Sequence, residues 1–292
     1  MESEEIQYIT LLSKVLETGQ EHTSRNATTK SIFNANLEFD LSKGFPLMTH
    51  KKMFFKGIVE ELLFFIRGDT NTKMLEEKGV YIWKGNTSKE FLDKMGFGYK
   101  EGLMGPNYGY NWRNFGSMYN TENGTPLHAG IDQLKNVVDT IKRDPYSRRI
   151  LLTSYDPMTV SQCVLYPCHT VIAQFHVSSE DILSMFCYIR SSDLLLGLPF
   201  NIASSALLLM LIAKITDKIP GKLYITLGDA HVYTAHLDAA RLACSRRYSL
   251  YNFPIIGLPD VKTLEDIEKL THSDISLHWY ESHGAISAPM IP

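Results

Sequence analysis

The chain has 292 residues, of which 44% are hydrophobic and 21% are charged, and its formal net charge is −3. This composition is typical of a soluble globular protein with a sizeable core, and the small negative charge argues against a general nucleic-acid binder without excluding a small anionic ligand held by local arginines. The acidic N-terminal segment MESEEIQYIT lacks the features of a secretory signal. Together with only four cysteines in so long a chain, this predicts reduced thiols in the cytosol or the nucleus.

Two patterns of apolar residues predict the first elements. Apolar residues recur at helical spacing from Ile6 to Leu16 and stop before Gly19, which predicts an N-terminal helix ended by a glycine. Apolar and polar residues then alternate from Phe33 to Leu41, which predicts a half-buried strand with the odd-numbered side chains on its buried face.

Helices and strands alternate irregularly along the rest of the chain. Helices are predicted over KMFFKGIVEELLFFIRG and IDQLKNVVDTIKRDP, the second of them ended by Pro145. Strands are predicted over RILLTSY, TVIAQFHV, ILSMFCYI and KLYITLG, with a hairpin turn at SSED. The stretch from Ile202 to Ala213 is too short to span a bilayer and reads as a buried core helix. We therefore expect an α+β fold, and a single domain over 1–292 because no linker or repeat interrupts the chain.

The stretch VLYPCHTVIAQF places Cys168 between a proline and a histidine, just before an apolar run. An isolated cysteine is most often an inert buried side chain. A disulfide at Cys168 does not suit a reduced compartment. The spacing of Cys163 and Cys168 does not suit a metal site, so no metal is expected. Two interpretations remain for Cys168, packing and nucleophilic catalysis.

A second stretch, IRSSDLLLGLPFNIASSALL, favours catalysis. A strand edge that ends in Arg190, Ser191 and Ser192 can hold a phosphate with a forked guanidinium and hydroxyl groups. Asn201 can offer a donor and an acceptor to a heterocycle. Taken alone, Arg190 would more often form a surface ion pair and Asn201 would more often cap a helix.

Together these stretches resemble the thymidylate synthase family, in its eukaryotic branch. The matching pieces run through nearly the whole chain and include GFPLMTHKK, EELLFFIRGDTN, GPNYGYNWRNFG, DPYSRRI, YPCH, RSSDLLLGLPFNIAS, PGKLYITLGDAHVY and the terminal SHGAISAP. The resemblance implies methylation of C5 of dUMP, with 5,10-methylenetetrahydrofolate as the donor of both the carbon and the hydride and without a metal. It also implies a large, mixed, mostly antiparallel sheet covered by helices.

The resemblance assigns catalytic roles to residues in these motifs. Cys168 would add as a thiolate to C6 of the uracil, with Arg190 supplying positive charge and holding the phosphate. Glu61 would relay protons through water, whereas Glu60 beside it would be the solvated carboxylate. Tyr108 would assist removal of the C5 proton. His169, Asp193 and Asn201 complete the expected catalytic set, with His169 ordering the pocket rather than acting as the principal base.

Binding roles follow from the same resemblance. The expected dUMP contacts are Arg25, Arg148, Arg149, Arg190, Ser191, Ser192, Asp193, Asn201, His231 and Tyr233. The expected folate contacts are Phe54, Trp83, Asp193 and Ile291. Because Arg148 and Arg149 match the pair that reaches the phosphate in the other subunit's site, the resemblance also implies an obligate homodimer whose sheets stack back to back.

Several positions depart from the family pattern without removing a residue assigned to the chemistry. They are Ile189, Tyr155, Asp156, Tyr166, Lys84 and the loop RNATTK. Two alternatives stay open at this point. One is a folate-dependent pyrimidine nucleotide hydroxymethylase, which would add water instead of hydride. The other is a catalytically weak relative that acts as an RNA-binding or scaffold protein.

Overall fold

The computed structural model describes residues 3–24 and 27–291. A six-stranded sheet forms the centre, in the order β1-β2-β6-β5-β4-β3. Its strands are β1 (Gln20–Thr23), β2 (Thr28–Asp40), β3 (Leu151–Thr153), β4 (Ile172–Val177), β5 (Ile182–Asp193) and β6 (Ile219–Tyr233). All neighbours are antiparallel except β5 and β6, which are parallel, so the expected mixed and mostly antiparallel sheet and the α+β class are confirmed.

The parallel pair requires a crossover, because parallel neighbours cannot be joined by a tight hairpin. Helix α7 (Gly197–Ile215) supplies it and fills the core beneath the sheet. By length and composition it is the one helix among the described residues that could cross a membrane, yet 78% of that stretch is buried inside the protein. The prediction of a buried core helix from Ile202 to Ala213 is therefore confirmed.

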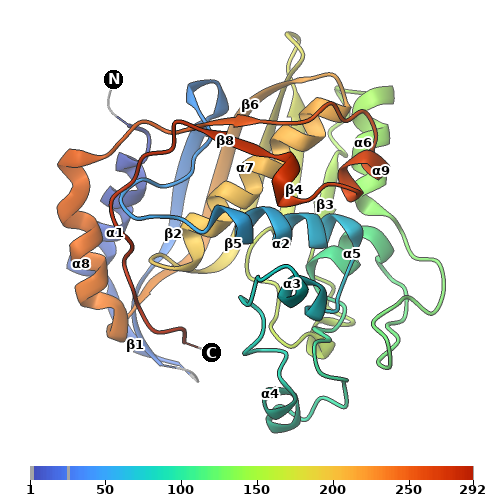
Figure 1. Ribbon diagram of the computed structural model, residues 1–292, viewed down its shortest axis with the longest axis horizontal. Coiled ribbons are helices and arrows are strands. Elements are labelled where there is room, and N and C mark those ends of the chain that lie inside the picture. Colours follow the sequence, from blue (N-terminus) through green and yellow to red (C-terminus); the bar gives the residue numbers. More distant parts are fainter. Residues whose placement is uncertain (1–2, 25–26, 292) are drawn as a thin grey trace.

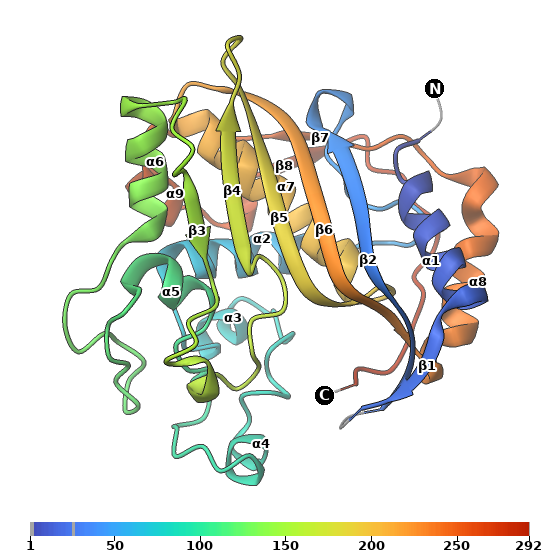
Figure 2. The ribbon, with the colours of Figure 1, turned by 180° about the vertical axis from the view of Figure 1, so that it is seen from behind.

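The other helices lie on the same side of the sheet as α7 or at its ends (Figure 1). They are α1 (Ile6–Thr18), α2 (Phe55–Arg67), α3 (Lys73–Glu77), α4 (Lys89–Lys94), α5 (Tyr108–Asn114), α6 (Gln133–Arg143), α8 (Leu237–Ser245) and α9 (Leu264–Glu268). A small ribbon of β7 (Ile255–Gly257) and β8 (Ser276–His278) completes the fold. Seen from behind, the opposite face of the sheet carries no helix (Figure 2).

The predicted helices and strands all appear. The N-terminal helix ends at Gly19, α2 ends at Gly68 with a left-handed φ of 77°, and the turn SSED joins β4 to β5. One detail is wrong. Phe33 is 82% exposed instead of buried, because Asn34 adopts a φ of 64° and interrupts the alternation of β2.

Candidate active site

Cys168 lies between the 3-10 turn Val160–Gln162 and β4, and it is half-buried. Its backbone N–H donates to the Tyr108 hydroxyl at 3.0 Å, and the same hydroxyl lies 3.4 Å from the Cys168 Sγ. Because the phenol oxygen accepts the amide proton, its own proton is available to the sulfur or to a ligand. Burial, followed by the nearby Cys168, raises the pKa of Tyr108 well above its ordinary value, so Tyr108 is a neutral hydroxyl at physiological pH.

Arg190 is tied to the backbone that leads into Cys168. Its Nε donates to the Pro167 carbonyl at 2.8 Å and its Nη2 to the Tyr166 carbonyl at 2.9 Å. Its own N–H donates to the Cys168 carbonyl at 2.9 Å. Within residues 3–24 and 27–291 the guanidinium forms no ion pair. Two backbone carbonyls fix this positive charge at the segment that leads into Cys168.

The residues after Cys168 hold it in a strained turn. Thr170 has a φ of 47°, which is costly for a β-branched residue, and its carbonyl accepts the Ser154 hydroxyl at 2.7 Å. His169 is buried and stacks on the Tyr108 ring at 4.5 Å. Burial lowers the pKa of His169 to about 4, so the imidazole is neutral and packs as a flat ring.

Glu61, on α2, accepts a hydrogen bond of 2.7 Å from the Trp83 indole. Burial raises the pKa of Glu61 to about 7, against a smaller lowering by that hydrogen bond. The Trp83 ring also meets the Tyr108 ring edge-on at 6.2 Å, which connects this carboxyl to the surroundings of Cys168. A carboxyl with a pKa near 7 can both give and take a proton at physiological pH.

The expectation for Glu60 is wrong. Its side chain is 3% exposed, pairs with Lys78 at 2.6 Å and accepts the backbone N–H of His272 at 2.8 Å. Glu60 therefore joins α2 to two other segments. The sequence could not reveal these contacts, because Lys78 follows α3 and His272 lies 212 residues further along the chain.

A first prediction follows from the pKa of Glu61. A carboxyl whose pKa rises from 4.5 in the unfolded chain to about 7 on folding stabilises the fold below pH 4.5, and that stability is lost as the pH rises through 7. A glutamine at position 61 does not titrate. The free energy of unfolding of Glu61→Gln, measured relative to that of wild type, should therefore rise by up to about 3 kcal/mol between pH 4.5 and pH 7. Urea denaturation at several pH values measures this gain.

Glu60→Gln is the matched control for this measurement. It breaks the ion pair to Lys78 on the same helix and should show no comparable gain as the pH rises. If the difference in free energy of unfolding between Glu61→Gln and wild type stays constant from pH 4.5 to 8, the raised pKa of Glu61 is contradicted.

The paired ends of β5 and β6 bring a second group of polar side chains together. Asp193 lies opposite His231 in the parallel register, and the two flank the buried Ser192, whose hydroxyl has no partner among the described residues. His231 contacts Asp229 through Nδ1 at 2.8 Å and the Tyr233 ring at 5.2 Å. A buried hydroxyl without a partner is costly.

Asn201 does not cap a helix. Helix α7 begins at Gly197, so Asn201 lies in its second turn, and the N-cap Leu196 makes no side-chain hydrogen bond. The Asn201 carboxamide forms no hydrogen bond within the described part of the chain. Both of its groups are available to a ligand.

Apart from Asp193 at the end of β5, the expected folate contacts lie on three separate segments. Phe54 precedes α2 and is 44% exposed, and its ring lies so close to Gly57 that a Cβ there would be 2.5 Å from it. Trp83 is buried beside Glu61, and Ile291 belongs to the C-terminal tail. Gly57 thus allows an exposed aromatic ring to lie across the start of α2.

Arg148 and Arg149 are not with the other residues. Both are exposed in the loop between α6 and β3, and neither makes a hydrogen bond or ion pair within residues 3–24 and 27–291. By the register of β3 and β4 this loop lies beside the Val177 end of β4, whereas Cys168 precedes its Ile172 end. The length of β4 alone separates them by roughly 15 Å at about 3.3 Å per residue. Arg25 lies outside the described residues.

The sequence pattern did not single out Thr170 or Lys51. Lys51 is buried, its Nζ donates to the Leu195 carbonyl next to Asp193, and burial lowers its pKa to about 8. The motif GFPLMTHKK contains Lys51 but does not tell which of its lysines points inward. Within the described residues, no group of three or more His, Cys, Asp or Glu side chains could hold a metal ion.

The fold and these side chains define an α+β protein with a half-buried cysteine beside a phenol, an anchored arginine and a buried carboxyl. The family model described as thymidylate synthase matches residues 6–292. The chain is 43% identical to the thymidylate synthase of Saccharomyces cerevisiae, over 98% of this chain and 97% of that protein, and 40% identical to that of Homo sapiens, over 98% and 90%. The chain belongs to the thymidylate synthase family, as its motifs predicted.

Some relatives are longer. The chain is 42% identical to the putative bifunctional dihydrofolate reductase-thymidylate synthase of Oryza sativa, over 98% of this chain and 57% of that protein. The chain thus spans about half the length of these bifunctional relatives.

Proposed function

We propose that this protein is a thymidylate synthase, which methylates C5 of dUMP with 5,10-methylenetetrahydrofolate and yields dTMP and dihydrofolate. One observation carries the proposal. In a chain of this family, the half-buried Cys168 lies 3.4 Å from a neutral phenol and is preceded by carbonyl groups that bind the Arg190 guanidinium.

The proposed chemistry begins at the sulfur. C5 of uracil is a poor nucleophile until something adds to C6, and the Cys168 thiolate forms the new bond to C6 while the electron pair of the C5–C6 double bond moves toward O4. Glu61, with a pKa near 7, would relay a proton to O4 through water. Tyr108 would assist removal of the C5 proton, and its hydroxyl already lies beside the sulfur.

The nucleotide would bind along the ends of β5 and β6. Arg190 and Ser191 would hold the phosphate, Asn201 the uracil edge, and His231 and Tyr233 the ribose hydroxyl. The Asn201 carboxamide, which binds no described residue, fits a polar ligand there. Phe54, Trp83, Asp193 and Ile291 would bind the folate, which supplies the one-carbon unit and the hydride when bound. We place the reaction in the cytosol or nucleus, where free thiols such as these four persist.

Product analysis tests the proposal directly. The protein is incubated with dUMP and methylenetetrahydrofolate, and both products are identified. Formation of dTMP with dihydrofolate is the expected result. A hydroxymethyl nucleotide with tetrahydrofolate would instead identify a hydroxymethylase, and no product at all would leave a non-catalytic relative.

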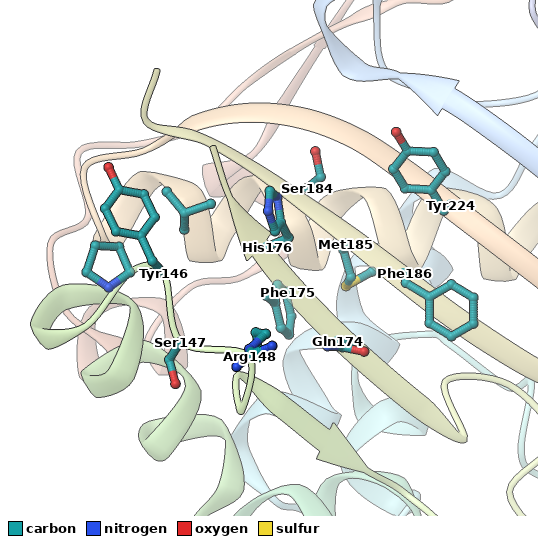
Figure 3. Close-up of a pocket in the computed structure, with 12 residues that line it drawn as sticks. Tyr146, Ser147, Arg148, Gln174, Phe175, His176, Ser184, Met185, Phe186 and Tyr224 are labelled. Carbon is teal, nitrogen blue, oxygen red and sulfur yellow. The ribbon is translucent and has the colours of Figure 1, made fainter. Parts of the chain in front are cut away.

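We also propose that the protein acts as a homodimer whose helix-free sheet faces pack together. That face carries exposed apolar side chains on neighbouring strands, among them Leu151, Ile172, Phe186 and Tyr224. A hollow of about 500 Å³ lies on it, lined by strands β4 and β5 and by the loop that holds Arg148 (Figure 3). An apolar sheet face with no helix against it is the kind of surface that a second copy buries.

The position of Arg148 supports a role at the other subunit's site. In Figure 3 its guanidinium lies beside Gln174 and Phe175, at the edge of the hollow. Because strand β4 separates this loop from Cys168 of the same chain, we expect Arg148 and Arg149 to serve the phosphate of the partner's site across the dimer interface.

Subunit exchange provides a prediction for this dimer. Arg149→Ala lacks one phosphate contact and Cys168→Ser lacks the nucleophile, so each protein alone should have little activity. In a mixed dimer one of the two sites combines an intact Cys168 with an intact Arg149. An equal mixture after full exchange should therefore recover about a quarter of the wild-type specific activity.

The control is the same mixture assayed before the subunits exchange, which should stay inactive. Mixed dimers that are verified by differently tagged chains and yet recover nothing would count against donation of Arg149 across the interface.

A further inference from the structure

Hydrogen bonds hold the described C-terminal tail to the body of the protein at successive points. The Tyr280 hydroxyl donates to the Met48 carbonyl at 2.8 Å and accepts the Met53 N–H, the His283 N–H donates to the Thr49 carbonyl at 2.9 Å, and Arg246 donates to the Gly284 carbonyl at 2.8 Å. The last contact joins the Pro289 carbonyl to His236. Figure 1 shows this tail in dark red as it leaves β8 and passes α8.

His236 is fully buried, and both nitrogens of its ring face oxygen atoms. Nε2 lies 2.7 Å from the Pro289 carbonyl oxygen. Nδ1 has no hydrogen-bond partner among the described residues and lies 3.8 Å from Oδ2 of Asp193, which is an ion-pair separation. A carbonyl and a carboxylate only accept protons. A neutral imidazole has one N–H, so its second nitrogen would present a lone pair to an acceptor, whereas an imidazolium donates toward both.

Asp193 is fixed from its other side. Its Oδ1 accepts the N–H groups of Leu195 at 2.9 Å and Leu196 at 3.3 Å, which leaves Oδ2 facing His236. Asp193 is also the expected acceptor of the folate pterin. The tail, His236 and this carboxylate therefore form one continuous connection between the end of the chain and the proposed folate site.

We propose that His236 is a positioning residue that, with a proton on each ring nitrogen, ties the C-terminal tail to Asp193. The proposal deepens the proposed function, on which its consequence for folate binding rests. The docking of the tail itself is a property of the folded chain and can be measured without any substrate.

The charged groups around the ring determine how this contact depends on pH. The contact with Asp193 is the largest influence and raises the pKa of His236, and the Pro289 carbonyl adds to this rise. Burial and the nearby Lys51 lower the pKa of His236 by less. The Tyr233 ring packs edge-on at 5.3 Å. Since the docked form holds the proton more tightly than the free imidazole does, docking is favoured below pH 6.5 and is lost as the pH rises through the raised pKa.

The first experiment measures hydrogen exchange of the tail in the ligand-free, full-length protein from about pH 6 to about pH 9, corrected for the intrinsic rate. In the wild type, protection of the amide at position 283, which donates to the Thr49 carbonyl, should fall as the pH rises. In His236→Gln, which cannot carry the charge, protection should be low and independent of pH. Wild-type-like protection with a wild-type pH dependence in His236→Gln would overturn the proposal.

Two further variants keep the test specific. His283→Gln removes a tail imidazole whose Nε2 lies 2.7 Å from the Ser249 carbonyl and which does not contact Asp193. This variant should therefore lower protection without removing its pH dependence. Asp193→Asn keeps His236 but removes its negative partner, and it should move the midpoint of the pH dependence to lower pH. Loss of the pH dependence in His283→Gln, or an unmoved midpoint in Asp193→Asn, would each contradict the role of His236.

The second experiment measures turnover with dUMP and methylenetetrahydrofolate. His236→Gln should raise the KM for the folate by about tenfold and lower kcat by much less, because it disturbs the position of a binding group. An unchanged KM, with the exchange results as expected, would show that the tail contact does not reach the folate site. A wild-type protein without turnover would contradict the proposed function and leave the exchange measurement as the test of the His236 contact.

Discussion

A Cys168→Ser protein should bind dUMP and lose roughly three or more powers of ten in kcat, which is in the range seen when an enzyme loses its nucleophile. An oxygen nucleophile at this position lacks the thiolate that sulfur can provide near a positive charge. The hydrogen bond from the Cys168 backbone to Tyr108 does not involve the side chain, so the substitution should leave the turn intact. Turnover under saturating dUMP and folate measures the loss, and binding of dUMP is followed separately.

The other three cysteines are matched controls for this prediction. Cys163 and Cys187 are buried, and burial raises the pKa of Cys163 to about 12 and that of Cys187 above its ordinary value. Burial also raises the pKa of Cys244, which accepts the Ser13 hydroxyl. Serine at any of these positions should leave kcat nearly unchanged in a folded protein. Equal inactivity of a folded Cys163→Ser protein would remove the support for Cys168 as the nucleophile.

The local elements were predictable because they depend on neighbours in the chain. The apolar spacing of α2 and its terminal Gly68 determine where that helix lies and ends. The exposure of Phe33 was not predictable, since the left-handed Asn34 next to it leaves no mark in an alternating pattern. Strand β6 extends from Ile219 to Tyr233, well past the predicted KLYITLG, because it pairs with β2 and β5 along nearly its whole length.

In the candidate site, too, some features were predictable from the sequence and others depend on distant segments. Its residue types followed from motifs, whereas the contacts among them depend on how distant strands pair. Arg190 reaches the Pro167 carbonyl only because β5 lies beside β4 in a register that places Tyr188 opposite Ile172. The burial of Glu60 and the two acceptors around His236 likewise come from segments far away in the chain. Pairwise contacts of this kind have no signature in a single sequence.

The second large effect concerns the choice of base, and it rests on Asn201. Uracil presents an N3–H donor beside an O4 acceptor, which one carboxamide can satisfy with two hydrogen bonds. Cytosine presents an N3 acceptor beside an N4 amino donor, so its groups would face like partners. An unpaired buried group costs about 1–3 kcal/mol, which corresponds to roughly 5- to 150-fold discrimination against dCMP. The carboxamide is available for this role, since no described residue binds it.

Asn201→Asp should therefore lower kcat/KM for dUMP and raise the relative use of dCMP, because a protonated carboxyl can donate to N3 and accept from N4. The ratio of kcat/KM for the two nucleotides, in wild type and variant, measures the effect. Asn201→Ala is the control, since it removes both groups and should weaken dUMP turnover without creating a partner for cytosine. Asn201 lies in the second turn of α7, so loss of a helix cap cannot explain a change in this ratio. If the ratio in Asn201→Asp equals that of wild type, the uracil edge is read by another part of the pocket.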